Sequence, residues 1–380
     1  MNLYEFEGKN LFSKHGIEIP KGIIIRRGDD VFKVYKDLAV QDVVVKAQVL
    51  SGKRGKNNGI RFCSSAEAVA KAVSELFSLN IRDQYVAAVW VEEKLEIVEE
   101  HYLSMTYDTN KKQPLLIYSR DGGMEIEEVV EDKIQKLHLK IQNERIDVNI
   151  PYAQQLWECF RTEDCRVVEI NPLVKTIDGR WVAADAKVAI DDDAFFRHEE
   201  WKQLEPRTML GRLPTEREVA VKAIDEGENY YRGTAGKYIE MEGDIAILFS
   251  GGGASIANMD ALMKAGLHPA NYTEYSGNPP REKVYALAKL VLAKPGLRGL
   301  WIAGGVANFT NVAETFHGIV DALDEIKPTY PIVVRRAGPC EEEGMRLMQE
   351  CAARNGLNMK LFGKETSMSD TADILARAIA

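Results

Sequence analysis

Short apolar runs alternate with amphipathic stretches along the first 120 residues. The runs that predict strands are 22–26, 43–49, 86–91, 101–107 and 115–119. A helical period over residues 66–79 predicts a helix between two of these strands. This mixture of elements predicts an α+β module.

A helix followed by a β-hairpin is predicted over residues 150–189. The two strands of the hairpin, 167–174 and 180–188, flank Asp178-Gly179, a dipeptide typical of two-residue hairpin turns. Pairing about this turn brings Asp185 nearly opposite Asn171.

The pattern changes at about residue 243, where strand-then-helix units begin. Apolar strands at 245–249, 299–302 and 332–334 each precede a helical stretch, and a strand at 360–362 precedes a last helix. Residues 271–280 interrupt this alternation and predict a polar, turn-rich loop. Short apolar strands alternating with helices predict a parallel sheet covered on both faces, with ligands beyond the carboxyl ends of its strands.

Composition places the chain among folded globular proteins and narrows its partners. Of the 380 residues, 45% are hydrophobic and 28% are charged, and the net charge is −9. A negative field repels nucleic acids and anionic membrane surfaces, so neither is an expected partner. The absence of a long apolar run and the charged start favour a cytoplasmic location. Five scattered cysteines fit reduced thiols better than a disulfide framework.

Groups suited to an anion follow each of the three strands. The triple glycine Gly251–Gly253 lets backbone N–H groups approach a ligand at a helix start, although it also fits a simple tight turn. Asn308 and Thr310 stand near the next helix start, where they could cap the helix or face a ligand. Arg335 and Arg336 end a buried strand, where a guanidinium needs an anionic partner, and only one of them should face the pocket.

The loop at 271–280 could complete this wall with the Ser276 hydroxyl and the Gly277 backbone. The whole set favours a small polycarboxylate or a phosphate as ligand.

Cations and oxygen ligands in the first half suit a nucleotide. Lys46 lies in an apolar strand, and the loop 51–59 adds three cations and three glycines that could fold over phosphates, or form a solvated turn. Glu169 and Asn171 share one face of the hairpin, and with Asp185 they offer hard oxygen ligands for Mg²⁺, or an ordinary polar face. Neither a Walker A sequence nor a GxGxxG motif is present, and no nucleophile is evident.

Longer motifs make the chain similar to the β subunits of the ADP-forming acyl-CoA synthetases, which include succinyl-CoA synthetase. The motifs that carry this resemblance are MNLYEFEGKNLFSKHGI, VVVKAQVLSGKRGK, DGGMEIEEV and VVEINPLVKTIDGRWVAADAKV. Within that family, the runs NYTEYSGNPP, GGVANFTNVAETFHGIV, VRRAGP and FGKETSM resemble the small subunits of ATP-citrate lyases. The resemblance implies an ATP-grasp domain over residues 1–240 and a flavodoxin-like, doubly wound ligase domain over 241–380.

The resemblance also implies a role for each matching residue. ATP would be bound by Lys46, Lys53, Arg54 and Gly55 at its phosphates and by Glu92 and Glu100 at its adenosine. Asn171 and Asp185 would hold Mg²⁺, and Glu169 would contact the histidine that carries the phosphoryl group. Citrate would be bound by Ser276, Gly277, Asn308, Thr310 and Arg336.

The activity implied is the activation of citrate through a phosphohistidine. A larger α-like partner subunit would carry that histidine, most of the CoA site and a citrate synthase-like domain. Citryl phosphate would react with CoA to give citryl-CoA, which is cleaved to acetyl-CoA and oxaloacetate. The alternatives are a succinyl-CoA synthetase β subunit, a citryl-CoA synthetase small subunit, and a regulatory sensor of nucleotide and citrate that has lost turnover.

Overall fold

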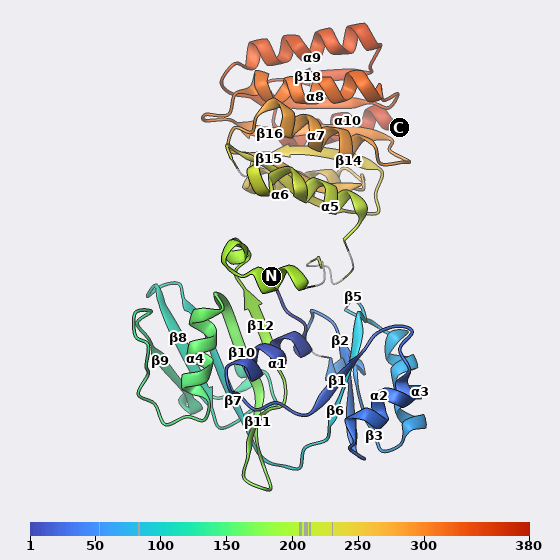
Figure 1. The fold of residues 1–380 in the computed structure, drawn as a ribbon. Coiled ribbons are helices and arrows are strands. Elements are labelled where there is room, and N and C mark those ends of the chain that lie inside the picture. Colours follow the sequence, from blue (N-terminus) through green and yellow to red (C-terminus); the bar gives the residue numbers. More distant parts are fainter. Residues whose placement is uncertain (53, 83, 205–206, 209–211, 213, 230) are drawn as a thin grey trace. The chain divides into compact units, whose positions relative to one another are not determined.

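The computed structural model describes the chain except for residues 53, 83, 205–206, 209–211, 213 and 230. It divides into two compact units, Met1–Leu213 and Pro214–Ala380 (Figure 1). The family resemblance implies a later domain boundary, between residues 240 and 241. Residues 216–240 join the second unit because helix α5 (Glu216–Lys222) packs on strand β13 (Thr234–Glu240), which pairs with that unit's sheet.

The first unit contains an antiparallel sheet of order β1-β6-β2-β3. Its strands are β1 (Gly22–Ile25), β6 (Ala88–Glu93), β2 (Val43–Gln48) and β3 (Ile60–Cys63). Helices α2 (Val31–Leu38) and α3 (Ala66–Phe77) cover one face, where valines of β2 and β6 pack on Val69, Val73 and Leu76 of α3 (Figure 1). The predicted helix and strands of this region are confirmed.

A second sheet in the same unit has the order β11-β10-β7-β8-β9, with β12 also paired to β10. Its strands are β7 (Ile97–Asp108), β8 (Gln113–Ser119), β9 (Ile134–His138), β10 (Cys165–Thr176), β11 (Trp181–Ala183) and β12 (Lys187–Ile190). Helix α4 (Ala153–Thr162) and helix α1 (Glu5–Lys14) pack on it with Trp157, Phe160 and Phe12. Helix α1 lies between the two sheets (Figure 1), and its backbone at Phe6 also bonds Gln48 of β2.

The predicted hairpin about Asp178-Gly179 is confirmed. Leu173 pairs with Ala183, and Glu169 pairs with Lys187. This register places Asp185 opposite Asn171, as the turn signal predicts.

The second unit is a six-stranded sheet of order β13-β15-β14-β16-β17-β18. Its parallel strands are β14 (Ile245–Ser250), β15 (Asn271–Ser276), β16 (Gly299–Val306), β17 (Ile332–Ala337) and β18 (Met359–Phe362). Numbered along the chain, these five strands have the order 2-1-3-4-5, which is that of flavodoxin. The predicted flavodoxin-like, doubly wound sheet is therefore confirmed.

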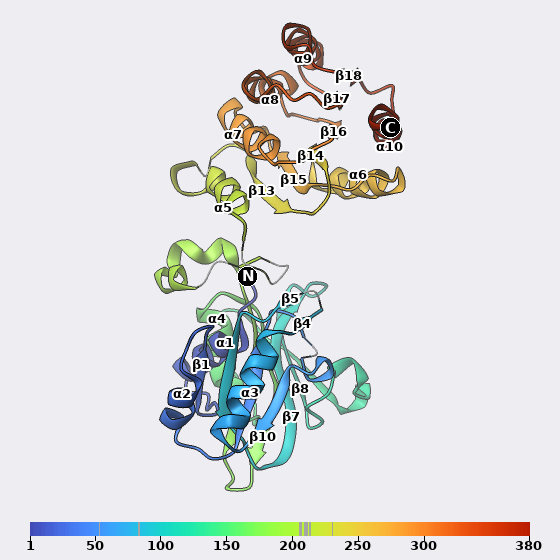
Figure 2. The same cartoon turned by 90° about the vertical axis from the view of Figure 1, so that its right-hand side faces the viewer.

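Helices cover both faces of this sheet (Figure 2). On one face lie α7 (Arg281–Leu292), α8 (Val312–Ile326) and α9 (Glu341–Asn355). On the other lie α6 (Gly252–Lys264) and α10 (Met368–Ile379). The described residues include no helix with the length and apolarity that crossing a bilayer requires.

The prediction of a loop over 271–280 is wrong for its first six residues, which form the buried strand β15. The polar side chains of this strand, which make its sequence resemble a loop, form hydrogen bonds within the unit. The side-chain amide of Asn271 bonds both the N–H and the carbonyl of Ile247, at 3.1 and 3.0 Å, and Glu274 bonds Lys237 at 2.7 Å. Because these partners come from neighbouring strands, the sequence pattern alone does not reveal the strand.

An ion cluster at Glu240 should make the stability of the second unit depend on pH. Burial alone would raise the pKa of Glu240, but bonds from Arg217 and Lys294 lower it to about 2. The resulting stabilisation is complete above the unfolded-state pKa near 4.5 and is lost as the pH falls toward 2.

Glu240→Gln should therefore lower the free energy of unfolding by about 1–2 kcal/mol at pH 7, allowing for solvent screening. Urea unfolding of both proteins at a series of pH values measures this difference. If the difference in free energy of unfolding stays constant from pH 7 to pH 3, the charge of the carboxylate contributes nothing to stability.

Candidate functional sites

Four loops meet at the carboxyl ends of the parallel strands in the second unit. They follow β14, β15, β16 and β17, and the strand order reverses between β14 and β16, which is where doubly wound sheets bind ligands. Helix α6 starts at Gly252, directly after Gly251, whose φ of 90° favours glycine.

Arg336 is a buried guanidinium at this switch point with unused capacity to donate. Its Nη1 donates to the carbonyl of Gly305 at 2.7 Å, whereas its Nε is buried without a partner among the described residues. Burial lowers the pKa of Arg336, and neighbouring Arg335 lowers it further. An anion at this position would supply the missing hydrogen bonds and charge.

Arg335 points elsewhere and has a structural role. Its guanidinium donates to backbone carbonyls of Thr366 and Gly304, each at 2.9 Å. The two arginines thus separate, as expected for neighbours in a strand, and Arg336 is the one with a free donor.

Asn308 and Thr310 do not cap α8, because that helix begins at Val312 and its cap is Asn311, which accepts from the N–H of Glu314 at 3.1 Å. The alternative that Asn308 or Thr310 caps this helix is therefore wrong. Thr310 is buried and Asn308 is exposed, and no side-chain hydrogen bond of Thr310 is found in the described part of the chain. Both side chains remain available to a ligand.

Ser276 ends β15 and is partly buried, and Gly277 follows with a φ of 71°. A Cβ on Gly277 would lie 3.2 Å from the Cα of Gly233. Close packing and positive φ together require glycine here. The loop is held to the start of α8 because Asn278 accepts from the N–H of Asn311 at 2.9 Å.

Gly304 sets the position of the Arg336 guanidinium. A Cβ on Gly304 would lie 2.6 Å from Nη1 of Arg336 and 2.9 Å from Cβ of Ser250. Gly304→Ala should therefore displace Arg336, destabilise the unit by about 1–3 kcal/mol and weaken acid binding. Calorimetric titration with citrate and with ATP tests this, since ATP affinity should not change. Full citrate affinity in this variant would contradict the packing argument.

The first unit gathers Lys46 and Arg54, two of the four predicted phosphate-binding residues, in one cluster of ion pairs. Arg54 makes two bonds to the carboxylate of Asp185, at 2.7 and 2.9 Å. Lys46 lies 2.6 Å from a carboxylate oxygen of Glu92 and donates to the carbonyl of Ala184 at 2.7 Å. Carboxylates around them raise the pKa of both cations against the effect of burial, so both stay charged.

Two residues of α1 that the sequence reasoning missed complete this cluster. Glu5 contacts Lys46 and Arg54, and Lys9 contacts Glu5 and Glu92. Burial alone would raise the pKa of Glu5, but the surrounding cations hold it well below its usual range. Glu5 and Lys9 are four residues apart, a spacing that is also typical of ion pairs on the exposed face of a helix. This spacing in the sequence therefore does not indicate a buried cluster.

Glu92 and Glu100 differ in environment. Glu92 is buried, and besides the lysines it accepts from the indole N–H of Trp90 at 2.6 Å. Its carboxylate is thus engaged in the ion cluster. Glu100 is exposed on β7, and its carboxylate lies over Gly123, whose φ is 72°.

Asn171 and Glu169 of the hairpin have different partners. Asn171 accepts from the N–H of Gly123 and donates to the carbonyl of Met124, both at 2.9 Å. Glu169 accepts from the hydroxyl of Tyr102 at 3.1 Å, and burial together with this carboxylate raises the pKa of Tyr102. Asn171 therefore contacts the loop at Gly123 and Met124, whereas Glu169, two residues earlier in the strand, contacts Tyr102.

The donor set of this cluster fits a nucleotide with Mg²⁺. Lys46 and Arg54 offer cationic donors to phosphate, and Asp185 and Asn171 offer the hard oxygen atoms that Mg²⁺ prefers. The Asp185 side chain is 34% exposed, so a ligand can reach its carboxylate. Gly55 starts an exposed 3₁₀ turn next to Arg54, whereas Lys53 lies outside the described residues.

Another group with metal-ligand spacing is formed by Glu163, His198 and Glu200. The ammonium of Lys14 lies 2.7 Å from Glu163 and 3.6 Å from Glu200, and His198 bonds Asp164 at 2.7 Å. The carboxylates and the imidazole of this group are therefore already engaged with other side chains of the chain.

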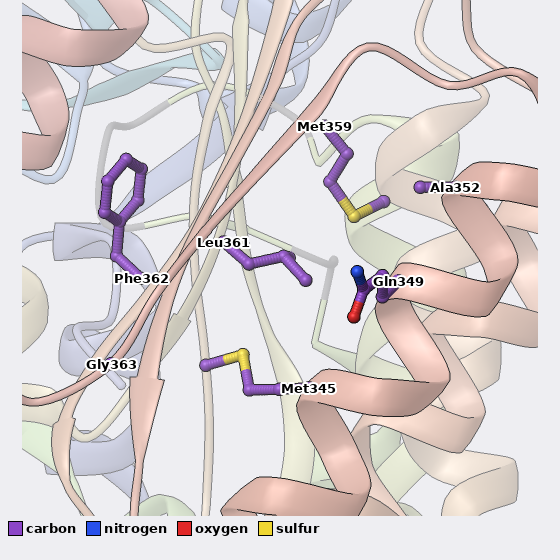
Figure 3. Close-up of a pocket in the computed structure, with 7 residues that line it drawn as sticks. All are labelled: Met345, Gln349, Ala352, Met359, Leu361, Phe362 and Gly363. Carbon is purple, nitrogen blue, oxygen red and sulfur yellow. The ribbon is translucent and has the colours of Figure 1, made fainter.

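A hollow between α9 and β18 is lined by uncharged residues (Figure 3). Its lining consists of Met345, Gln349, Ala352, Met359, Leu361, Phe362 and Gly363. The Phe362 ring points to the opposite side of the strand from Leu361 (Figure 3). Since none of these side chains is charged, the hollow is unsuited to a polycarboxylate.

Together, these features define an ATP-grasp protein that carries a second, flavodoxin-like unit. Family models agree with this division: one described as "ATP-grasp domain" matches residues 2–149, and one described as "ATP citrate lyase citrate-binding" matches residues 212–379.

Curated relatives show the family. The β subunit of an ADP-forming succinate–CoA ligase from Desulfurococcus amylolyticus is 35% identical, and the match covers 92% of this chain and 94% of that protein. The corresponding subunit from Methanocaldococcus jannaschii is 34% identical, over 96% and 99% of the two chains. The chain belongs to this family of β subunits of ADP-forming acid–CoA ligases.

A solved structure has the same fold over the full length. It is an ATP citrate lyase from Methanothrix soehngenii in complex with citrate and coenzyme A, with a TM-score of 0.79, 24% identity and 99% coverage of both chains. At this identity the likeness establishes the fold alone.

Proposed function

We propose that this chain is the ATP- and citrate-binding subunit of an ATP-citrate lyase. The observation that carries the proposal is Arg336, a buried guanidinium with an unpartnered Nε at the switch point of a unit that matches the citrate-binding family model. Ser276, Gly277, Asn308 and Thr310 would surround the acid, with the Thr310 hydroxyl and backbone N–H groups as neutral donors.

The ATP end rests on the ion cluster of the first unit. Lys46, Lys53, Arg54 and Gly55 would hold the phosphates, and Glu100 would contact the adenosine. The buried carboxylate of Glu92 is already bonded to Lys9, Lys46 and Trp90, so its predicted contact with the adenosine is not proposed. Asn171 and Asp185 would hold Mg²⁺, which neutralises phosphate charge during phosphoryl transfer. Glu169, oriented by the Tyr102 hydroxyl, would contact the histidine that receives the phosphoryl group.

The acceptor histidine would come from a larger α-like partner subunit, since the sequence of this chain offers no evident nucleophile. Phosphoryl transfer from that histidine to a citrate carboxylate gives citryl phosphate, and the thiol of CoA then displaces phosphate. The partner would bind most of CoA and would cleave citryl-CoA to acetyl-CoA and oxaloacetate.

Succinate is the second candidate substrate, because the curated relatives at 34–35% identity are named succinate–CoA ligases. Succinate has two carboxylates and lacks the hydroxyl and third carboxylate of citrate. A site with one buried arginine, a buried threonine and several polar loop groups offers more donors than a dicarboxylate uses.

Titration calorimetry of the purified chain with citrate, succinate and malate tests the first step. ADP release by the chain co-expressed with its partner subunit, with each acid plus CoA, tests turnover. Binding and turnover of citrate support the proposal. Activity with succinate alone would overturn it, and citrate binding without turnover in the assembled complex would identify a sensor.

A further inference from the structure

The ion cluster under the proposed nucleotide site has balanced charge. Its carboxylates are Glu5, Glu92 and Asp185, and its cations are Lys9, Lys46 and Arg54. Three negative and three positive groups give a net charge of zero.

The cluster has a deep layer and an accessible layer. The side chains of Lys9, Glu5 and Glu92 are 0%, 1% and 3% exposed. Those of Lys46 and Arg54 are 10% and 9% exposed. A ligand can therefore contact Lys46 and Arg54 from outside, while Glu5 and Lys9 act on them from below.

Glu5 contacts both accessible cations through different oxygen atoms. Its Oε1 lies 3.0 Å from Nζ of Lys46, and its Oε2 accepts from Nη1 of Arg54. Lys9 in turn holds Glu5 at 2.8 Å and bonds Glu92. Two cations placed side by side repel each other and need such a shared anion to keep their positions.

The guanidinium of Arg54 divides its contacts between the layers. Nη1 bonds Glu5 and Nη2 bonds Asp185. A phosphate can therefore replace Asp185 at Nη2 while Glu5 keeps Nη1 in place, which leaves the Asp185 carboxylate for a metal ion.

We propose that Glu5 and Lys9 of helix α1 are positioning residues of the nucleotide site: Glu5 fixes Lys46 and Arg54 for phosphate, and Lys9 balances the charge of Glu5. This inference rests on the proposed ATP site. It assigns the N-terminal helix a role in nucleotide binding besides its packing on the second sheet.

Variants of the full chain that remove one charge test whether Glu5 and Lys9 position the cations or only pack helix α1 in the unit. In Lys9→Met the net charge of the cluster becomes −1, and Glu5 and Glu92 compete for the ammonium of Lys46. Mg-ATP affinity should therefore fall by about tenfold or more. In Glu5→Gln the net charge of the cluster becomes +1, so Mg-ATP affinity should stay within about threefold of the wild-type value. Phosphorylation of the partner should slow by about 30-fold or more, because the two cations lose the group that positions them. Lys14→Met, in the same helix, is the matched control and should change neither value.

The double variant tests charge balance directly. Glu5→Gln with Lys9→Met leaves Lys46 paired with Glu92 and Arg54 paired with Asp185, so Mg-ATP affinity should return to within about threefold of the wild type. Phosphorylation should stay slow, because no group then joins the two cations. If the double variant instead keeps the affinity loss of Lys9→Met, charge balance is refuted.

Glu5→Asp is a second, more conservative variant, which tests the proposal even if Glu5→Gln fails to fold. It keeps the charge but shortens the side chain, so Mg-ATP affinity should be retained and phosphorylation should slow by about tenfold. Wild-type rates in Glu5→Asp and in Glu5→Gln would overturn the positioning role. Failure of the wild type to bind ATP would instead refute the proposed function, so calorimetry on that protein comes first.

Discussion

Replacing Arg336 with methionine should weaken citrate binding by about 100-fold to 1000-fold and leave ATP binding unchanged. A buried guanidinium makes charge-assisted hydrogen bonds worth about 1.5–3 kcal/mol each. The unpartnered Nε–H of Arg336 can donate one such bond, and its Nη groups carry further N–H donors for a polycarboxylate. Calorimetric titration of the variant with citrate and with ATP measures both effects.

The same variant should not lose stability. Among the described residues, Arg336 donates one side-chain hydrogen bond, to Gly305. The substitution removes this bond together with the cost of a buried charge, and such replacements are often neutral or stabilising. Arg346→Met, at an exposed position on α9, is the control. Unchanged citrate affinity in the Arg336 variant would exclude this residue from the site, and a large drop in the free energy of unfolding would show that Arg336 serves the fold.

Replacing Asp185 with asparagine should slow phosphorylation of the partner subunit by about 100-fold or more, as removal of a group that stabilises transferring charge does elsewhere. The amide lacks the charge that Mg²⁺ requires, and Arg54 loses the carboxylate that it bonds at 2.7 and 2.9 Å. Citrate affinity should not change, because Asp185 belongs to the first unit.

Phosphate transfer from labelled ATP in the co-expressed complex measures this rate, and Mn²⁺ titration in the presence of ATP measures metal affinity. Asp178→Asn is the matched control, since Asp178 lies at the turn of the same hairpin and bonds Arg180 and Thr176. Undiminished phosphorylation in Asp185→Asn would refute the metal assignment.

Elements with a strong local signal were predictable from the sequence. The valines of β2 and the alternation of strands and helices after residue 243 follow from periodicity, and Asp178-Gly179 fixes the hairpin register by itself. The opposite directions of Arg335 and Arg336 follow from the two-residue repeat of a strand.

Features that depend on distant partners were not predictable in the same way. Strand β15 looks like a loop until Asn271 is seen to bond the backbone of Ile247. The cap of α8 also falls on Asn311, which no residue-by-residue preference distinguishes from nearby Asn308.

The sequence by itself determined the two kinds of unit and the doubly wound sheet, and it supplied the groups that are proposed to bind phosphate, metal and acid. The tertiary structure alone decided how those groups are used: Arg336 keeps a free donor, Arg335 does not, and Glu5 and Lys9 lie beneath the cations rather than on a helix surface. Local patterns reflect forces between residues close in the chain. The charge balance of a buried cluster depends instead on residues up to 180 positions apart, from Glu5 to Asp185, which only folding brings into contact.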